Sequence, residues 1–170
     1  PIYNHEWFKK MVTNSILVDG PEMAEIAAAA KRNGVFVSLG FSEASRVSVG
    51  CIWNSNVLIG DDGRILNHHR KLMPTFYEKM VWAPGDGHGL AVSDTRIGKF
   101  GALICGENTN PLARYSLAAQ GEQIHISAWP AIWPTREPGI GKNFDNLAAN
   151  RIRAGGASFE AKAFGILCAG

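Results

Sequence analysis

The stretch Phe-Gly-Ala-Leu-Ile-Cys-Gly-Glu-Asn-Thr-Asn-Pro, residues 100–111, decides the fold. Its apolar beginning, up to Ile104, predicts a buried strand that ends at Cys105. Asn110 and Pro111 fit the N-cap and the first position of a helix. Cys105 therefore lies between a strand and a helix, where free backbone N–H groups and the helix dipole stabilise a thiolate. The alternative is that Cys105 is an inert, buried apolar side chain, as most lone cysteines are.

Helices and strands alternate on both sides of this stretch. Downstream, the sequence predicts a helix over residues 111–119, a strand over 123–129, a helix over roughly 144–163 and a strand over 164–170. Upstream, it predicts a helix over residues 21–33, a strand over 35–40, and a hairpin whose strands, 51–59 and 64–69, flank a Gly-Asp-Asp-Gly turn. This alternation, with one inserted hairpin, predicts a layered α/β architecture with a mixed sheet.

Composition narrows the class of protein. At 170 residues the chain is long enough for one domain with its own core, and its 46% hydrophobic and 19% charged residues are ordinary globular values. No apolar run approaches the roughly 20 residues that cross a bilayer, so we expect a soluble protein without a membrane partner. A net charge of +2 argues against nucleic acid as a partner and favours a small, uncharged or weakly polar substrate.

The cysteines indicate the cellular location of the protein, and the chain ends indicate the extent of its domain. Cys51, Cys105 and Cys168 are an odd number at wide spacing, and no secretory leader precedes them, so a reducing, cytoplasmic location is expected. The absence of a Cys-x-x-Cys pair argues against a thiol redox protein. Pro1 and the strand-like last residues suggest a single domain, residues 1–170, that is truncated at both ends. Strands left unpaired at those ends predict poor solubility or aggregation of the isolated chain.

Two further side chains suit catalysis. Lys71 follows the predicted hairpin in a proline-bounded loop, where its cation could polarise a substrate and lower the pKa of a thiol. Glu78 could pair with Lys71 and orient it. In isolation, a solvated surface lysine and an ordinary loop carboxylate are the favoured interpretations of these two residues. The adjacent His68 and His69 should point to opposite faces of a strand, and spaced Cys/His pairs are absent, so we do not expect a zinc site.

These motifs carry a resemblance to a known family. Residues 69–75 (His-Arg-Lys-Leu-Met-Pro-Thr) with Glu78, and residues 103–108 (Leu-Ile-Cys-Gly-Glu-Asn), resemble the lysine and cysteine blocks of the nitrilase superfamily of carbon-nitrogen hydrolases. The likeness continues along residues 111–115, 119–130 and 150–154 and looks closest to the branch that cleaves nitriles. It implies a four-layer α-β-β-α sandwich with mixed sheets, of which this chain is the central part, and a homo-oligomeric full-length protein.

The resemblance also implies a mechanism and a set of site residues. Cys105 matches the nucleophile, Lys71 the catalytic lysine and Glu78 the supporting glutamate. A small nitrile would form a thioimidate and then a thioester on Cys105, releasing ammonia, with no metal or organic cofactor. The backbone N–H of Gly106 would stabilise the intermediate, and Trp129 would line the substrate pocket, although a tryptophan that only packs in the core is an equal alternative.

Two departures from the family pattern leave other functions open. The family's first catalytic glutamate lies in a Phe-Pro-Glu type of motif that is absent here, and Glu43 does not substitute for it because it follows the helix at residues 21–33 instead of preceding it. Gly106 stands where many nitrile-cleaving members have tryptophan. An amidase or carbamoylase of the same superfamily is one alternative to a nitrilase, because the same three groups serve amide hydrolysis. The missing base favours a second alternative, a catalytically inactive interaction fragment.

Overall fold

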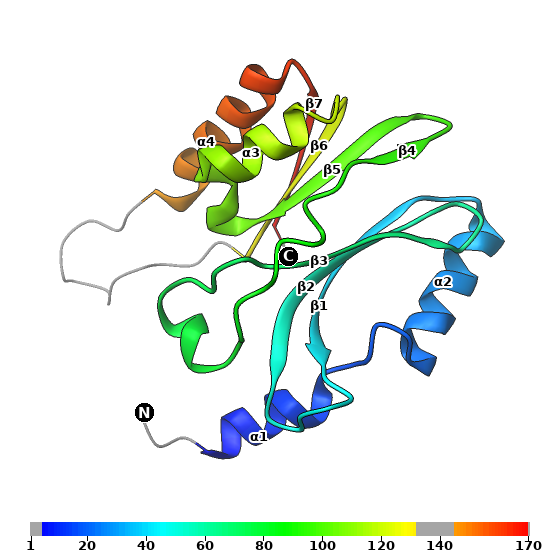
Figure 1. The fold of residues 1–170 in the computed structure, drawn as a ribbon, viewed down its shortest axis with the longest axis vertical. Coiled ribbons are helices and arrows are strands. Elements are labelled where there is room, and N and C mark those ends of the chain that lie inside the picture. Colours follow the sequence, from blue (N-terminus) through cyan, green and yellow to red (C-terminus); the bar gives the residue numbers. More distant parts are fainter. Residues whose placement is uncertain (1–4, 132–144, 170) are drawn as a thin grey trace. The chain divides into compact units, whose positions relative to one another are not determined.

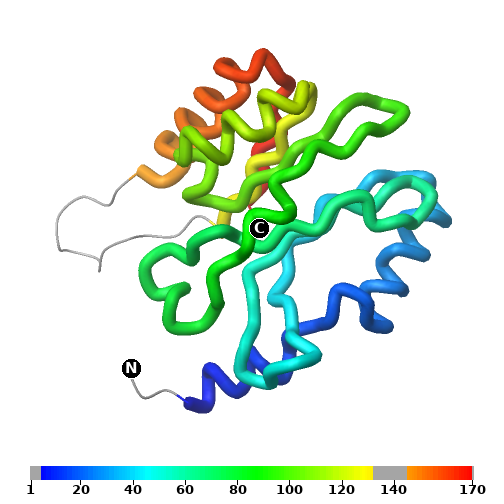
Figure 2. Tube along the Cα trace, viewed as in Figure 1, coloured from blue at the N-terminus to red at the C-terminus, as the bar shows by residue number. Residues whose placement is uncertain are grey.

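The computed structural model describes residues 5–131 and 145–169. The chain divides into two compact units, which we call unit 1 (residues 1–93) and unit 2 (residues 94–170). Figures 1 and 2 show the course of the chain through both units. The sequence-based prediction of one domain over residues 1–170 stays a prediction.

Unit 1 consists of an antiparallel sheet with helices beside it (Figure 1). Its elements, in chain order, are α1 (His5–Asn14), α2 (Pro21–Asn33), β1 (Val37–Ala44), β2 (Ile52–Ile59), β3 (Ile65–Arg70) and the 3-10 helix η1 (Phe76–Met80). The three strands lie in the order β1-β2-β3. A small core forms where Met23 and Ala30 of α2 pack with Val57 and Ile59 of β2.

Helix α2 begins and ends at the predicted residues. Pro21 occupies the first helical turn, where its missing N–H has no helical partner to lose. Gly34 follows the helix in a left-handed conformation, with φ of 61°, and its N–H donates to carbonyl groups of the last turn, Ala30 and Lys31. These local signals fixed both ends of the helix.

The hairpin of β2 and β3 is confirmed, whereas the predicted bounds of β1 were wrong. β1 begins two residues later than residue 35 and continues to Ala44, because it pairs with β2 over its whole length, from Val37 opposite Ile59 to Ala44 opposite Ile52. The polar end of β1, which includes Glu43, belongs to the strand because β2 and β3 supply hydrogen-bonding partners there.

Unit 2 is a four-stranded sheet with two helices (Figure 1). Its elements are β4 (Ser93–Thr95, which begins at the last residue of unit 1), β5 (Gly98–Ile104), the 3-10 helix η2 (Cys105–Thr109), α3 (Pro111–Ala118), β6 (Ile124–Trp129), α4 (Asn146–Ala161) and β7 (Phe164–Ala169). The strand order is β4-β5-β6-β7, and the β5, β6 and β7 neighbours are parallel. Helices α3 and α4 contact each other, and α4 also contacts β6 and β7.

The strand–turn–helix sequence predicted around Cys105 is confirmed. Asn110 is the N-cap of α3, since its side-chain oxygen accepts hydrogen bonds from the N–H groups of Leu112 and Ala113. The helices and strands that follow agree with prediction to within one or two residues, apart from positions 144 and 170, which lie outside the described residues. Among the described helices, none is long and apolar enough to span a membrane.

Candidate active site

Cys105 lies at the carboxyl end of β5, at the first residue of η2, and has a left-handed backbone. Its φ is 53°, and among the described residues only Phe76 and Lys162 share a positive φ without being glycine. A left-handed conformation costs a non-glycine residue roughly 1–2 kcal/mol. Such a conformation persists only where the surrounding structure enforces it.

Two side chains that follow Cys105 enforce this turn. A carboxylate oxygen of Glu107 accepts a hydrogen bond from the N–H of Ile104 at 2.8 Å. The Nδ2 group of Asn108 donates to the carbonyl oxygen of Leu103 at 3.2 Å and to that of Cys105 at 3.0 Å. Glu107 is 6% exposed and Asn108 is completely buried. The backbone before and after the Cys105 thiol is therefore held by buried hydrogen bonds.

A second row of buried polar groups supports Asn108. Its Oδ1 atom lies 2.8 Å from Nε2 of His125 and accepts a hydrogen bond from the Ser127 hydroxyl, also at 2.8 Å. Nδ1 of His125 lies 2.7 Å from a carboxylate oxygen of Glu122. Sequence analysis missed this cluster. The signal was present, because His125 and Ser127 are polar residues at alternate positions of the otherwise apolar strand β6.

Trp129 shares a face of β6 with His125 and Ser127, because the three residues alternate along the strand. β6 contacts α4 and η2. The guanidinium of Arg153, on α4, lies 5.9 Å from the centre of the Trp129 ring. The indole is 7% exposed, and its N–H has no hydrogen-bonding partner in the described part of the chain. Gly106 follows Cys105 directly within η2. Whether Gly106 and Trp129 bind substrate stays a prediction.

A cavity of about 360 Å³ lies between α3 and α4, away from the cysteine. Its walls include Arg114, Glu160 and the buried pair of Glu122 and His125. The lining does not include Cys105, Gly106 or Trp129. This cavity is therefore not the pocket that the sequence predicts around the nucleophile.

In unit 1, Lys71 is buried and paired with Glu78. The lysine is 1% exposed, and its ammonium donates to a Glu78 carboxylate oxygen at 2.5 Å and to the Thr75 hydroxyl at 3.2 Å. The same Glu78 oxygen accepts from the N–H of Thr75 at 2.6 Å. The alternative that Lys71 is a solvated surface lysine was wrong. A buried ammonium needs such a partner, because an unpaired charge in the interior is costly.

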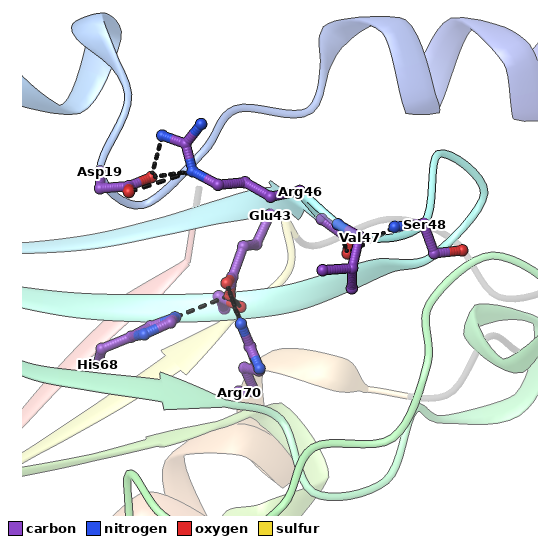
Figure 3. A network of polar contacts seen from close by, with 9 residues as sticks. Asp19, Glu43, Arg46, Val47, Ser48, His68 and Arg70 are labelled. Atoms are coloured by element: carbon purple, nitrogen blue, oxygen red, sulfur yellow. Dashed lines mark hydrogen bonds and ion pairs between the residues drawn. The ribbon is translucent and has the colours of Figure 1, made fainter.

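A second polar network is centred on Glu43 (Figure 3). Its members His68 and Arg70 lie at the end of β3, on the face opposite to Lys71, which follows that strand. The buried Glu43 carboxylate binds Arg70 at 2.5 Å, His68 at 2.7 Å and the Ser55 hydroxyl at 2.5 Å. Burial by itself raises the pKa of Glu43, but the hydrogen bonds from His68, Arg70 and Ser55 outweigh it and lower the pKa from 4.5 to about 2. The hydrogen bond to Glu43 in turn raises the pKa of Arg70, whose guanidinium also lies 3.9 Å from the centre of the Trp53 ring.

The sequence-predicted site residues are thus distributed over both units. The structure brings Lys71 and Glu78 together within unit 1, and it places Cys105, Gly106 and Trp129 in unit 2. A cysteine at a strained strand-to-helix turn and a buried lysine–glutamate pair, both on α/β units, fit the class of α/β enzymes that use a cysteine nucleophile.

Comparison with known families identifies the particular family. The family of carbon-nitrogen hydrolases matches residues 1–151, and the chain belongs to it. A cyanide hydratase of Gibberella baccata is 45% identical over 130 residues, which are 76% of this chain and 36% of that protein. A nitrilase of Penicillium rubens is 41% identical over 138 residues, 81% of this chain and 41% of the relative. The arylacetone-specific nitrilase of Alcaligenes faecalis is 40% identical over 131 residues, 77% of this chain and 36% of the relative.

Solved structures confirm the fold class. A carbon-nitrogen hydrolase from Helicobacter pylori matches 87% of this chain and 49% of its own, with a TM-score of 0.73 and 25% identity. Nit3 of Saccharomyces cerevisiae, a member of branch 10 of the nitrilase superfamily, matches 98% of this chain and 57% of its own, with a TM-score of 0.74 and 20% identity. The chain therefore has the α/β fold of this superfamily and spans about two fifths of the length of the curated relatives that it matches.

Proposed function

We propose that this chain is the central part of a nitrilase that converts a small nitrile to the carboxylic acid and ammonia, with Cys105 as the nucleophile. The observation that carries the proposal is the agreement of two independent features. Relatives that are 40–45% identical are named for nitriles or cyanide. Cys105 occupies a strained turn at the end of a buried strand, the position of an activated nucleophile.

The chemistry proceeds by covalent catalysis. The Cys105 thiolate adds to the nitrile carbon and gives a thioimidate, whose nitrogen takes up a proton. Water adds to the thioimidate carbon, ammonia leaves, and the thioester that remains is hydrolysed to the acid with return of the thiol. Each addition places charge on a nitrogen or oxygen, and a fixed N–H donor such as that of Gly106 stabilises this charge.

Lys71 and Glu78 are proposed to act as a pair on the same intermediates. The Lys71 ammonium supplies positive charge and donates to the substrate nitrogen, while Glu78 holds the ammonium in place through their ion pair. The base that takes the thiol proton is not supplied by a recognisable motif in residues 1–170. Activity is therefore to be measured on a form of the protein extended to the length of its relatives.

The broader setting is part of the same proposal and rests on the family resemblance. Residues 1–170 are proposed to belong to one carbon-nitrogen hydrolase domain, and the longer protein is proposed to work as a cytoplasmic homo-oligomer on a small-molecule substrate. The proposed steps use side chains and backbone groups alone, without a cofactor.

A second candidate reaction is hydration of the nitrile to an amide. It is favoured by the similarity to cyanide hydratases, which are 45% and 46% identical to this chain. The two reactions diverge at one tetrahedral adduct: loss of ammonia leads to the acid, and loss of the thiol leads to the amide. An amidase or carbamoylase would use the same residues on an amide instead.

The decisive experiment compares the extended protein with two cysteine variants. Ammonia, acid and amide are measured from a panel of aromatic, arylaliphatic and aliphatic nitriles, cyanide and the matched amides. Cys105→Ala should abolish every product, whereas Cys51→Ala, a control at another partly buried cysteine, should retain activity. Acid with ammonia supports the nitrilase, amide alone supports a hydratase, and turnover of amides alone supports an amidase. Product formation that survives Cys105→Ala would refute the proposed nucleophile, and no activity on any substrate would support the inactive fragment.

A further inference from the structure

The hydrogen bonds of Asn108 fix the orientation of the peptide group that joins Cys105 to Gly106. We infer that Asn108, together with His125 and Glu122 behind it, forms a set of positioning residues that aims the Gly106 N–H at the anionic intermediate. The inference rests on the proposed function of Cys105 and adds to it three residues that do not touch the substrate.

Peptide geometry links the Cys105 carbonyl to the Gly106 N–H. The described residues contain no cis peptide bond, so the Cys105 carbonyl and the Gly106 N–H lie in one plane and point in opposite directions. Nδ2 of Asn108 holds that carbonyl oxygen at 3.0 Å. Rotation of the peptide plane would break this partly buried hydrogen bond, and an unsatisfied carbonyl group away from water is costly. The direction of the Gly106 N–H is thus set by Asn108.

The partners of Asn108 determine where the hydrogens lie in this cluster. Both contacts of Nδ2 are carbonyl oxygens, so the amide nitrogen must be the donor, and Oδ1 must accept from Ser127 and from Nε2 of His125. Nε2 of His125 therefore carries a hydrogen. Nδ1 of His125 and the Glu122 carboxylate, 2.7 Å apart, then share one proton between them. Within this cluster, the partners of Asn108 thus determine which of its atoms donates and which accepts a hydrogen bond.

Asn108, His125 and Glu122 have little room to move. Asn108 is completely buried, His125 is 2% exposed and Glu122 is 6% exposed. The carboxylate of Glu122 occupies the space where a Cβ atom would stand at Gly101, on the neighbouring strand β5. A glycine at this position lets the carboxylate approach the strand that carries Cys105. Close packing of this kind leaves the Glu122 carboxylate little freedom to move.

The consequence is a specific kinetic effect. A donor that stabilises charge only in the intermediate changes kcat and leaves substrate affinity nearly unchanged. Loss of one such donor lowers kcat by about 100-fold to 1,000-fold in well-studied hydrolases. Since Asn108 acts through Gly106, its loss should reproduce most of that effect.

The test compares Asn108→Asp with Asn110→Asp in the extended protein. The carboxylate introduced by Asn108→Asp keeps the shape of the side chain but cannot donate to the two carbonyl groups. Asn110→Asp makes the same chemical change two residues away, at an exposed N-cap where an aspartate serves equally well. We expect kcat to fall by about 100-fold in the Asn108 variant with KM changed by less than about threefold. The Asn110 variant should match wild type. An unchanged kcat in Asn108→Asp would overturn the inference.

Two additional measurements keep the inference testable if Asn108→Asp does not fold. Ser127→Ala removes one of the two hydrogen bonds to Oδ1 and should lower kcat by about 3-fold to 10-fold, as expected for one hydrogen bond of about 1 kcal/mol; an unchanged kcat would count against the inference. ¹⁵N NMR of histidine-labelled wild-type protein, with His125 assigned from His125→Gln, should show a hydrogen on Nε2. A His125 ring protonated on Nδ1 alone would overturn the inference, and this result does not depend on any measurement of activity. If the proposed function itself fails, wild type shows no Cys105-dependent turnover, so the two failures are distinguishable.

Discussion

Glu43 offers the sharpest test of the energetics of unit 1, because its carboxylate ties β1 to β2 and β3 on the face opposite Lys71. The perturbation is Glu43→Gln, which keeps the size of the side chain and removes its charge. The measurement is the free energy of unfolding by urea at pH 7 and at pH 3. Glu25→Gln, at an exposed position on α2, is the matched control.

The expected magnitude follows from the pKa of Glu43. A pKa lowered from 4.5 to about 2 on folding means that the ionised carboxylate stabilises the folded state. The shift corresponds to about 3 kcal/mol at pH 7. This contribution is complete above the unfolded pKa and declines as the pH falls from 4.5 towards 2, so about 2 kcal/mol of it should be lost by pH 3.

The two proteins should therefore differ most at neutral pH. We expect Glu43→Gln to unfold with about 3 kcal/mol less free energy than wild type at pH 7, and with about 1 kcal/mol less at pH 3. Glu25→Gln should follow wild type at both pH values. A difference between wild type and Glu43→Gln that stays the same at pH 7 and pH 3 would refute the reasoning, because the variant would then act by packing and not by charge.

Three other substitutions probe features that the structure makes specific. Gly101→Ala should lower the free energy of unfolding by about 1–3 kcal/mol in urea, since the new methyl group would overlap the Glu122 carboxylate. Gly63→Ala should lower the melting temperature and cost about 1–2 kcal/mol, because φ is 82° there and the methyl group would press on the carbonyl of Ala27. Ile166→Lys should reduce self-association of the 170-residue chain in sedimentation velocity, because it places a charge on the exposed edge strand β7; equal association of both proteins would point to another surface.

Local signals in the sequence predicted most of the elements, because the residues that decide helix ends and turns act on their own neighbours. Pro21 and Gly34 marked the two ends of α2, and Asn110 marked the start of α3. The end of β1 could not be predicted in this way. Its polar residue Glu43 is stabilised by Ser55 and Arg70, which are distant in sequence, so the strand continues where its own composition suggests a loop.

In the candidate site too, the sequence predicted what neighbouring residues decide and did not predict what residues distant in sequence decide. The motif around Cys105 indicated a nucleophile, but the left-handed φ of the cysteine was not predictable from its neighbours, since the turn is enforced by Asn108 and by the β6 residues that bind it. Likewise, the burial of Lys71 could not be inferred from a loop sequence. It depends on Glu78, which lies in the short helix η1 and accepts a hydrogen bond from the Lys71 ammonium.

The two candidate catalytic groups are held by similar means. In β3, side chains alternate, so His68 and Arg70 bind Glu43 on one face while Lys71 follows on the other face, buried against Glu78. The network of Glu43 thereby fixes the strand end that presents the ammonium without contacting it.

In unit 2, Asn108 holds the backbone of Cys105 in a similar way. Asn108 is itself held by His125, which contacts Glu122. Buried networks of this kind are costly when one member is lost, because the remaining members keep their desolvation cost without their hydrogen bonds. Substitutions in either network should therefore change stability and reactivity together. Substitution of Cys105 itself should abolish turnover and leave the fold largely intact, because the left-handed backbone of this residue is enforced by Asn108 and not by the thiol.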